Sequence, residues 1–562
     1  MDALPFNQLV YRRIDLEKLS LEMRRARLRL RLAMNHDSAV QAVMEMDQLR
    51  RHYQTMKALA AIRHDQHTED AYYAAENDFY DQIDCQVDQQ VQQFYATLLN
   101  TRHRTALESQ FGSLVFRKAE NFRTTIKPEV LADLAGENGL ATQYDQLMST
   151  LAVPLNGQTL SLAQIEPHLQ AADRTERRQA HAALATALQG QSEQLDAIFD
   201  QLVNHRRTIS RKLGFSSFTD LGYRRMERLD YRREQIDVLR QNILRFFVPI
   251  TMEIRRLQRR RLKLDQLFYF DLPCLYPDGN PALQVTPDGL AAAANQVAAK
   301  VSRQDPSFVQ ELAENGYLDL IARPGKTQGG YCETLYEADL PFILMNASGT
   351  PQDAMVLMHE CGHAYATLRS FKHTDLLEHH QPTLETCEIH STAMEYLSYP
   401  HLDAFFGPAG QEAALLHMTE SLLFLPYGCM VDEFQHRIYD EPSLTPADRN
   451  QVWLELEHRY QPDLDYDGAP FFSEGRAWQK KEHIFSAPFY YIDYVLAQLT
   501  ALDIWSTSRK HPDRAWKKYD ALCEAGGHGT FLELLGKAGL ASPFEPDTIK
   551  RLAFAVCDFL AL

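Results

Sequence analysis

The sequence predicts a mainly α-helical fold with one small β-sheet. From about residue 14 to about residue 262, apolar residues recur at three- and four-residue intervals amid many charges, which is the period of amphipathic helices. Between about residues 264 and 348 the pattern changes to short aromatic or β-branched runs bounded by Pro, Gly and Asp, as in strands. Helical periodicity resumes at Pro351 and continues to the end of the chain.

The N-terminal half is expected to consist of long helices. Segments 16–34, 39–63 and 175–213 carry the helical period most clearly. Asn156 and Gly157 separate two short apolar runs, which predicts a hairpin, and Gly214 is expected to end the helix before it. No repeat, low-complexity tract or Pro/Gly-rich linker marks a domain boundary, so any boundary drawn in the sequence is arbitrary.

Three short segments are expected to form the small sheet. They are residues 267–273, 317–321 and 341–346, which are rich in aromatic or branched apolar side chains and end at Pro, Gly or Asp. They directly precede the helical segment that begins at Pro351, so the sheet is expected to lie next to that helix.

Composition and charge exclude several classes of protein. The chain has 562 residues, of which 45% are hydrophobic and 24% charged, as in ordinary globular proteins. The net charge of −17 argues against a nucleic-acid partner, because phosphate binding needs clustered Lys and Arg. One basic cluster, Arg255, Arg256, Arg259, Arg260 and Arg261, is interpreted as a solvated helix face.

The sequence is typical of a cytoplasmic protein without a membrane partner. Its first residues lack a basic region followed by an apolar core, so no signal peptide is expected. No run of about eighteen apolar residues suggests a membrane span. The eight cysteines are scattered and form no Cys-x-x-Cys pair, which favours a reducing compartment. The oligomeric state cannot be read from the sequence.

The helix expected after Gly349 has a clear start and one buried face. Thr350 suits the N-cap, Pro351 the first helical position, and Asp353 completes a pair resembling a capping box. Apolar or small residues then recur at helical spacing, predicting a buried stripe at Ala354, Leu357, Met358, Cys361, Ala364, Tyr365 and Leu368.

His359, Glu360 and His363 on this helix predict a zinc site. The two histidines are one turn apart and project from the same face, so their ring nitrogens can bind one Zn²⁺ ion. Glu360 is rotated by about a hundred degrees from His359 and is expected to reach the open coordination position. There it can take a proton from the attacking water and later return it to the leaving amine.

A catalytic zinc also needs a third protein ligand. A second helix is expected to begin near Pro382 and to place Glu385, Glu388 and Glu395 near one face. From spacing alone, Glu385 and Glu388 are both candidates for the third ligand. Glu395 is expected either to orient a ligand imidazole or to form a surface salt bridge.

Beyond these residues, the C-terminal two-thirds of the sequence resembles the thimet-oligopeptidase and oligoendopeptidase F zinc metallopeptidases, most closely the oligoendopeptidase F and Pz-peptidase branch. The matching motifs are residues 329–332, 341–343, 346, 349–350, 359–363, 388–391, 431–436, 488–494 and 526–527. In that family the third zinc ligand follows the second histidine after twenty-four intervening residues, which implies Glu388 here. The resemblance therefore implies one zinc ion per chain, bound by His359, His363 and Glu388.

The resemblance also implies a fold and further site residues. It implies an elongated, nearly all-helical zincin-type body with a deep substrate channel and a zinc ion on its floor. Residues 341–346 resemble the family's edge strand, which pairs with the substrate backbone. His483 and the tyrosines that follow it are expected at helical spacing. The resemblance implies that His483 stabilises the oxyanion together with Tyr491 and Tyr494, which are favoured over Tyr490. The alternative is that these aromatic side chains only pack in the core.

The sequence thus predicts a zinc-dependent endopeptidase that hydrolyses short unstructured oligopeptides. Residues 1–180 would be a helical N-terminal portion, and residues 181–562 the zinc-binding portion of one continuous body. Two alternatives remain open: a zinc metallocarboxypeptidase, and a non-catalytic peptide-binding protein. The presence of Glu360 argues against the second, because binding alone does not need a base.

Overall fold

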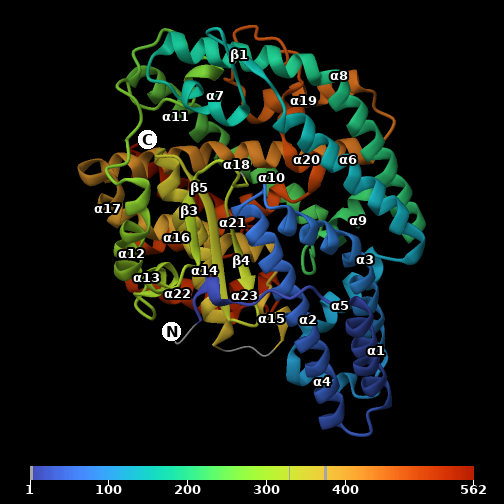
Figure 1. Ribbon diagram of the computed structural model, residues 1–562. Helices are drawn as coiled ribbons and strands as arrows, with labels where there is room; N and C mark the ends of the chain where they lie inside the picture. Colours follow the sequence, from blue (N-terminus) through green and yellow to red (C-terminus); the bar gives the residue numbers. More distant parts are fainter. Residues whose placement is uncertain (1–3, 328, 373–375) are drawn as a thin grey trace. The chain divides into compact units, whose positions relative to one another are not determined.

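The computed structural model describes residues 4–327, 329–372 and 376–562 (Figure 1). It is mainly helical with two small sheets, so the predicted fold class is confirmed. By its internal contacts the chain forms two compact units. Unit 1 comprises Met1–Thr124, Pro281–Ala414 and Thr500–Ser542, and unit 2 comprises Thr125–Asn280, Leu415–Leu499 and Pro543–Leu562.

Unit 1 contains the N-terminal helices, the three-stranded sheet and the helices that follow it. Its elements of four or more residues are α1 (Leu16–Leu32), α2 (His36–Gln66), α3 (Ala71–Asn100), α4 (Arg104–Phe111), α5 (Ser113–Thr125), α12 (Leu290–Val301), α13 (Phe308–Glu314), β3 (Leu318–Ile321), β4 (Tyr331–Leu335), β5 (Leu340–Ala347), α14 (Pro351–Phe371), α15 (Leu377–His380), α16 (Leu384–Ser398), α17 (Asp403–Phe406), α22 (Pro512–Ala525) and α23 (Phe531–Ala538).

Unit 2 is built largely from the middle of the chain. Its main elements are α6 (Leu131–Ser149), β1 (Val153–Leu155), β2 (Gln158–Leu160), α7 (Leu162–Leu169), α8 (Arg174–Leu213), α9 (Phe218–Arg225), α10 (Arg233–Phe246), α11 (Val248–Arg261), α19 (Pro446–Tyr460), the 3₁₀ turn η7 (Ala477–Lys480), α20 (Glu482–Ser486) and α24 (Pro546–Leu560). Helices α18 (Gly410–Asp440) and α21 (Tyr491–Ser508) are divided between the two units, and the last residue of α5, Thr125, belongs to unit 2.

Local sequence signals set the predicted helix ends and the hairpin. Helices α1, α2 and α8 occupy the three segments with the clearest helical period. Gly214 ends α8 in the left-handed conformation, with φ +87°. Asn156 and Gly157 have φ values of +51° and +80° and join β1 to β2, so the predicted hairpin is confirmed.

The three-stranded sheet has the order β3-β5-β4, with β3 parallel and β4 antiparallel to β5. The expectation that residues 341–346 form an edge strand is therefore wrong, because β5 is the central strand. All of its residues except Asn346 are buried, as in a strand that is covered on both sides. Figure 1 shows β4 and β5 beside α14, in agreement with their contacts.

Residues 267–273 do not form the predicted strand. Their centre is a 3₁₀ turn, η3 (Tyr269–Asp271). The carboxylate of Asp271 accepts the backbone N–H of Phe268 at 3.0 Å and pairs with Arg174 at 2.8 Å. These local and long-range polar contacts fix the turn, whereas the aromatic composition alone resembled a strand.

The basic cluster on α11 is only partly a solvated face. Arg255 is buried; it pairs with Asp463 at 2.6 Å and donates a hydrogen bond to Gln461 at 2.7 Å. Arg256, Arg259 and Arg260 are exposed, as expected. The interpretation is therefore wrong for Arg255, which a partner distant in sequence draws into the core.

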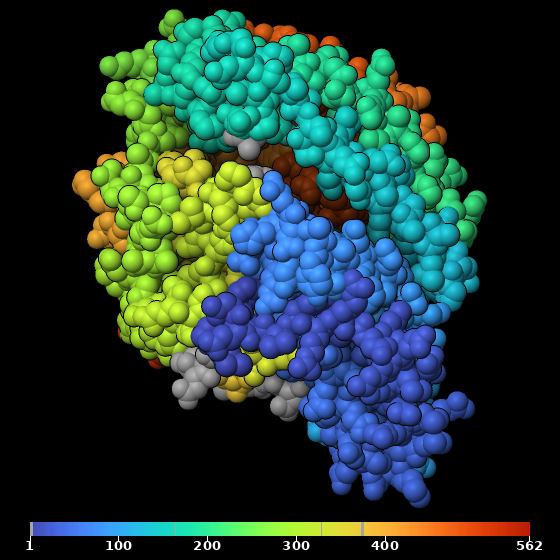
Figure 2. All heavy atoms as spheres, in the orientation of Figure 1, coloured from blue at the N-terminus to red at the C-terminus, as the bar shows by residue number. Residues whose placement is uncertain are grey.

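The N-terminal segment of unit 1 packs against the sheet. The Phe6 ring lies 4.4 Å from the ring of Phe342 and 5.8 Å from that of Tyr317, centroid to centroid. The Phe6 N–H also donates to the carbonyl of Asn315 at 2.9 Å. Figure 2 shows the dark blue N-terminal residues against the yellow-green surface of this region.

Helix α15 is anchored to the N-terminal helices of the same unit. The Glu378 carboxylate accepts hydrogen bonds from Arg50 and Tyr95, and the Leu377 N–H donates to Asp47 at 2.7 Å. On its other side, the Gly527 N–H donates to the carbonyl of His379 at 2.6 Å. Contacts from three distant parts of the chain therefore hold α15 just ahead of α16.

One helical stretch among the described residues is apolar enough to cross a membrane by length and composition. It spans Asp403–Asp440, and 61% of its most apolar window is buried inside the protein. A buried core helix meets the same criterion, so this is weak evidence for a membrane span.

Candidate active site

The start of α14 is fixed by Asp353. Its Oδ2 atom accepts the backbone N–H groups of Ser348, Gly349 and Thr350 at 2.9, 2.7 and 3.0 Å. The Thr350 hydroxyl donates to Oδ1 at 3.0 Å. The predicted pairing of Thr350 with Asp353 is thus confirmed, and it orders the loop that leads from β5 into the helix.

Gly362 lets α14 and α16 approach each other closely. A Cβ atom on Gly362 would lie 2.4 Å from the carbonyl oxygen of His390 and 2.7 Å from the Cα atom of Ser391. The backbone of α16 therefore packs directly onto the turn of α14 that connects His359 to His363. Sequence reasoning missed this residue, although a glycine inside an apolar helix was the available signal.

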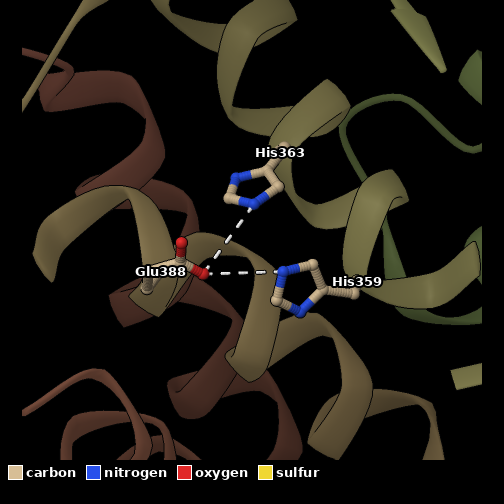
Figure 3. Close-up of side chains that lie close together, drawn as sticks. All are labelled: His359, His363 and Glu388. Atoms are coloured by element: carbon tan, nitrogen blue, oxygen red, sulfur yellow. Dashed lines mark ion pairs between the residues drawn. The ribbon is translucent and has the colours of Figure 1, made fainter. Parts of the chain in front are cut away.

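His359, His363 and Glu388 come together at this crossing, as Figure 3 shows. The Oε2 atom of Glu388 lies 3.5 Å from His359 Nε2 and 4.0 Å from His363 Nε2, and the three donor atoms lie within 4.8 Å of one another. Donors bound tetrahedrally to zinc lie roughly 3.3–3.6 Å apart. The group therefore has nearly the size and chemistry that a zinc site requires. Glu385 is buried on the same helix but lies outside this group.

Glu395 contacts the far side of the His359 ring. Its Oε1 atom lies 2.7 Å from His359 Nδ1, while His359 Nε2 faces Glu388. Glu395 is buried, so this contact is not a surface salt bridge. A carboxylate in this place fixes both the ring orientation and the nitrogen that is available to a metal.

Glu360 lies beside the group in a buried position. Burial raises the pKa of its carboxyl to about 7, and its Oε2 atom has no hydrogen-bond partner among the residues that the structure describes. Burial also lowers the pKa of His363 to about 4, which favours the neutral imidazole that metals bind. Burial and the charge of Glu360 raise the pKa of Cys332 on β4, a strand that packs against α14.

His483, Tyr491 and Tyr494 form an aromatic cluster in unit 2. The centroid of the His483 ring lies 5.1 Å from that of Tyr491 and 5.8 Å from that of Tyr494. Tyr490 stacks on His483 at 5.9 Å. The expected continuous helical spacing is wrong, because His483 lies on α20 and the two preferred tyrosines lie on α21. The three metal-ligand candidates belong to unit 1.

The turn between α20 and α21 is held at Phe489, whose φ of +72° is unusual for a residue with a side chain. Its N–H donates to Gln435 Oε1 at 2.8 Å, and its carbonyl accepts a hydrogen bond from Arg228. A Cβ atom on Gly222 would lie 2.4 Å from the Phe489 ring, so a glycine is needed beneath it. These contacts keep the unfavourable backbone conformation in place.

Residues 431–436 matched the family motif without a physical explanation, which the structure supplies. Three of the polar side chains each contact another helix of unit 2: Asp432 with Arg240 at 2.7 Å, Glu433 with Tyr460 at 2.6 Å and His436 with Tyr223 at 3.1 Å. Their contacts are therefore structural.

Comparison with known proteins gives matches along most of the chain. A model described as the peptidase M3 N-terminal domain matches residues 6–126, and one described as peptidase family M3 matches residues 294–554. Oligopeptidase PepF of Bacillus subtilis (strain 168) is 22% identical over 545 residues, covering 91% of this chain and 78% of that protein.

Two solved structures are similar throughout. Pz peptidase A with an inhibitor is 36% identical, with a TM-score of 0.94 and 99% of each chain covered. A structure described as an oligoendopeptidase F, from Bacillus anthracis str. Ames, is 34% identical, with a TM-score of 0.90, covering 100% of this chain and 99% of that one.

Proposed function

This chain belongs to peptidase family M3, and on that premise we propose that it is a zinc-dependent endopeptidase acting on short unstructured oligopeptides. The observation that carries the proposal is the group of His359, His363 and Glu388 with the buried Glu360 beside it. A structural zinc site would use four protein ligands, whereas three ligands with an adjacent carboxylate are typical of a catalytic one.

The residues of the group fit a zinc ion, and each has a separate task. Two imidazole nitrogens and one carboxylate oxygen are the donors that zinc prefers, and Glu395 orients His359 from behind. The bound ion would supply positive charge that polarises the scissile carbonyl and acidifies the attacking water. Glu360 takes the proton of that water and delivers it to the departing amine.

The aromatic cluster of unit 2 supplies the remaining proposed roles. His483, Tyr491 and Tyr494 carry N–H and O–H donors, and donors aimed at the developing oxyanion lower the barrier of acyl transfer. The deep channel remains a prediction of the family resemblance. In it, only short or unfolded chains would reach these groups.

The substrate backbone is proposed to pair with β4 rather than with β5. The central strand β5 has a neighbour on each side, so a peptide that extends the sheet must join β3 or β4. We favour β4 because it packs against α14, the helix that carries Glu360. A peptide paired there would pass beside the base.

Replacing the base tests the proposed chemistry. Glu360→Gln keeps the size of the side chain and all three ligands, so it should still bind one zinc ion per chain. Because it cannot take up a proton, kcat/KM for an internally quenched peptide should fall by about 10²–10⁴-fold. The measurements are metal content by elemental analysis and steady-state kinetics; unchanged turnover at full zinc content would refute the role of Glu360.

A blocked peptide distinguishes the endopeptidase from the metallocarboxypeptidase alternative. An endopeptidase should cut a peptide with an amidated C-terminus at internal bonds, because it needs no terminal carboxylate. A carboxypeptidase should release nothing from it. Mass spectrometry of the products separates the two, and a zinc-loaded protein that binds but cleaves neither form would favour the non-catalytic alternative.

A further inference from the structure

Lys481 is a half-buried cation in the aromatic cluster of unit 2. It lies between η7 and α20, two residues before His483. Its Nζ atom lies 4.8 Å from the centroid of the Tyr491 ring and 5.6 Å from that of Tyr427. Two aromatic faces therefore hold the ammonium in one place through cation–π attraction.

This ammonium has no anionic partner within the described part of the chain. Its Nζ atom makes no hydrogen bond or ion pair with any described residue. Burial lowers the pKa of Lys481, while Glu482, its exposed neighbour, acts on it only at longer range. The aromatic faces compensate for only part of the hydration that the Lys481 ammonium loses on burial. An anion that accepts hydrogen bonds from its N–H groups would therefore be stabilised there.

The surroundings favour a negatively charged ligand over a neutral one. Lys480 precedes Lys481 and is exposed, and Glu166 opposes part of its charge, so Lys481 is the cation expected to meet the ligand. A carboxylate could meet the Lys481 ammonium in a charge-assisted hydrogen bond of about 2.7–2.9 Å. The rings of Tyr427 and Tyr491 would restrict the direction from which it approaches.

We propose that Lys481 binds a carboxylate of the peptide substrate, carried either by the C-terminus or by an Asp or Glu side chain. This inference rests on the proposed function, in which His483 and Tyr491 face the reacting bond. The contacts of 5.1 Å from His483 to Tyr491 and 4.8 Å from Tyr491 to Lys481 place the ammonium within about 10 Å of the imidazole. An extended peptide advances about 3.3–3.6 Å per residue, so the carboxylate would lie up to about three residues from the scissile bond.

Matched peptides test this proposal. The zinc-loaded wild type is compared with Lys481→Gln, Lys481→Arg and the control Lys480→Gln, which removes the same charge one residue earlier. One pair of short peptides differs only in a free or amidated C-terminus. A second pair, both amidated, differs only in Glu or Gln within three residues of the cleaved bond. Steady-state kinetics give KM and kcat for each, with zinc content and melting temperature as checks on folding.

In wild type, KM should be about ten-fold lower for the anionic member of at least one pair, as one charge-assisted contact provides. The pair that responds identifies the source of the carboxylate. Lys481→Gln should abolish the preference without a comparable loss of kcat, and both Lys481→Arg and Lys480→Gln should retain it.

The proposal is overturned if Lys481→Gln keeps the preference, if Lys480→Gln loses it equally, or if wild type shows none in either pair. In each of these outcomes the amidated, uncharged peptide is still cleaved, so the proposed endopeptidase function stands. Failure of zinc-loaded wild type to cleave any of the four peptides would instead contradict the proposed function itself.

Discussion

Replacing Glu395 should lower the affinity for zinc without removing a ligand of the metal. Its carboxylate lies 2.7 Å from His359 Nδ1, the ring nitrogen that faces away from Glu388. Glu395→Gln should weaken zinc binding by about 10–100-fold, because the imidazole loses the carboxylate that orients it. Glu388→Ala, which removes a donor atom, should bind zinc far more weakly still. Competition with a coloured chelator measures both, and an equal loss in the two variants would mean that Glu395 is itself a ligand.

Local geometry explains which site residues the sequence could predict. His359, Glu360 and His363 lie on one helix, so their spacing alone fixes how they project. Glu385 and Glu388 lie nearly one turn apart on α16, and spacing gives them almost the same face. The choice between them depends on how α16 crosses α14, which involves Gly362 and is invisible to periodicity.

At the scale of elements, the crossing of α14 and α16 should be intolerant of any side chain at Gly362. A methyl group would meet the His390 carbonyl at 2.4 Å, whereas ordinary C···O contacts are about 3.3 Å or longer. The helices would have to separate by close to 1 Å, while metal–ligand distances tolerate about 0.2 Å. Gly362→Ala should therefore lower zinc affinity at least ten-fold, as measured by metal competition.

Gly536→Ala provides the matched control for that prediction. Gly536 is also helical, on α23 in the same unit, and a Cβ atom there would meet nothing within 4 Å. Zinc affinity should be unchanged in this variant, and helix propensity would favour alanine by up to about 1 kcal/mol. If both alanine variants bind zinc as wild type does, the helices can separate without moving the ligands.

Helices and strands were predictable where nearby residues determine them. They were less predictable where contacts with segments distant in sequence determine their conformation or position. The start of α14 followed from Thr350, Pro351 and Asp353, which act within a single turn. The position of β5 inside its sheet did not, because strand order depends on residues 318–321 and 331–335 pairing from either side. Residues 267–273 had the composition of a strand, but Arg174 and Asp271 fixed a turn there instead.

For the molecule as a whole, the buried pair of Arg50 and Glu378 should make stability depend on pH. Burial alone would raise the pKa of Glu378, but Arg50 and Tyr95 lower it to about 2. The folded state therefore holds the proton less tightly than the unfolded state, whose carboxyl has its ordinary pKa of 4.5. The stabilisation, at most about 3 kcal/mol, is complete above pH 4.5 and is lost as the pH falls towards 2.

Comparing wild type with Glu378→Gln across pH measures this contribution. At pH 7 the variant should denature at a lower urea concentration, because it also leaves Arg50 buried without its anion. The difference in midpoint should shrink as the pH is lowered below 4.5. A difference that stays constant down to pH 3 would show that Glu378 does not titrate as described.

The sequence alone could not predict which stretches of the chain make up each of the two units. Each unit joins three separate stretches of chain, and no change in composition marks the points where the chain passes between them. The prediction of a mainly helical protein needed only periodicity, but assigning the N-terminal helices and residues 500–542 to the same unit needs the long-range contacts themselves. Pairs such as Asp47 with Leu377 are separated by hundreds of residues.

The residues that anchor α15 are synthesised at widely separated times. During synthesis the helices that hold Glu378 are made first, and the histidines of α14 follow hundreds of residues later. Gly527, whose N–H donates to the carbonyl of His379, follows those histidines in the chain and leaves the ribosome later still. The contacts that hold the segment leading to Glu388 are therefore complete only after Gly527 has emerged, so a nascent chain would carry both histidines before it could hold a zinc ion firmly.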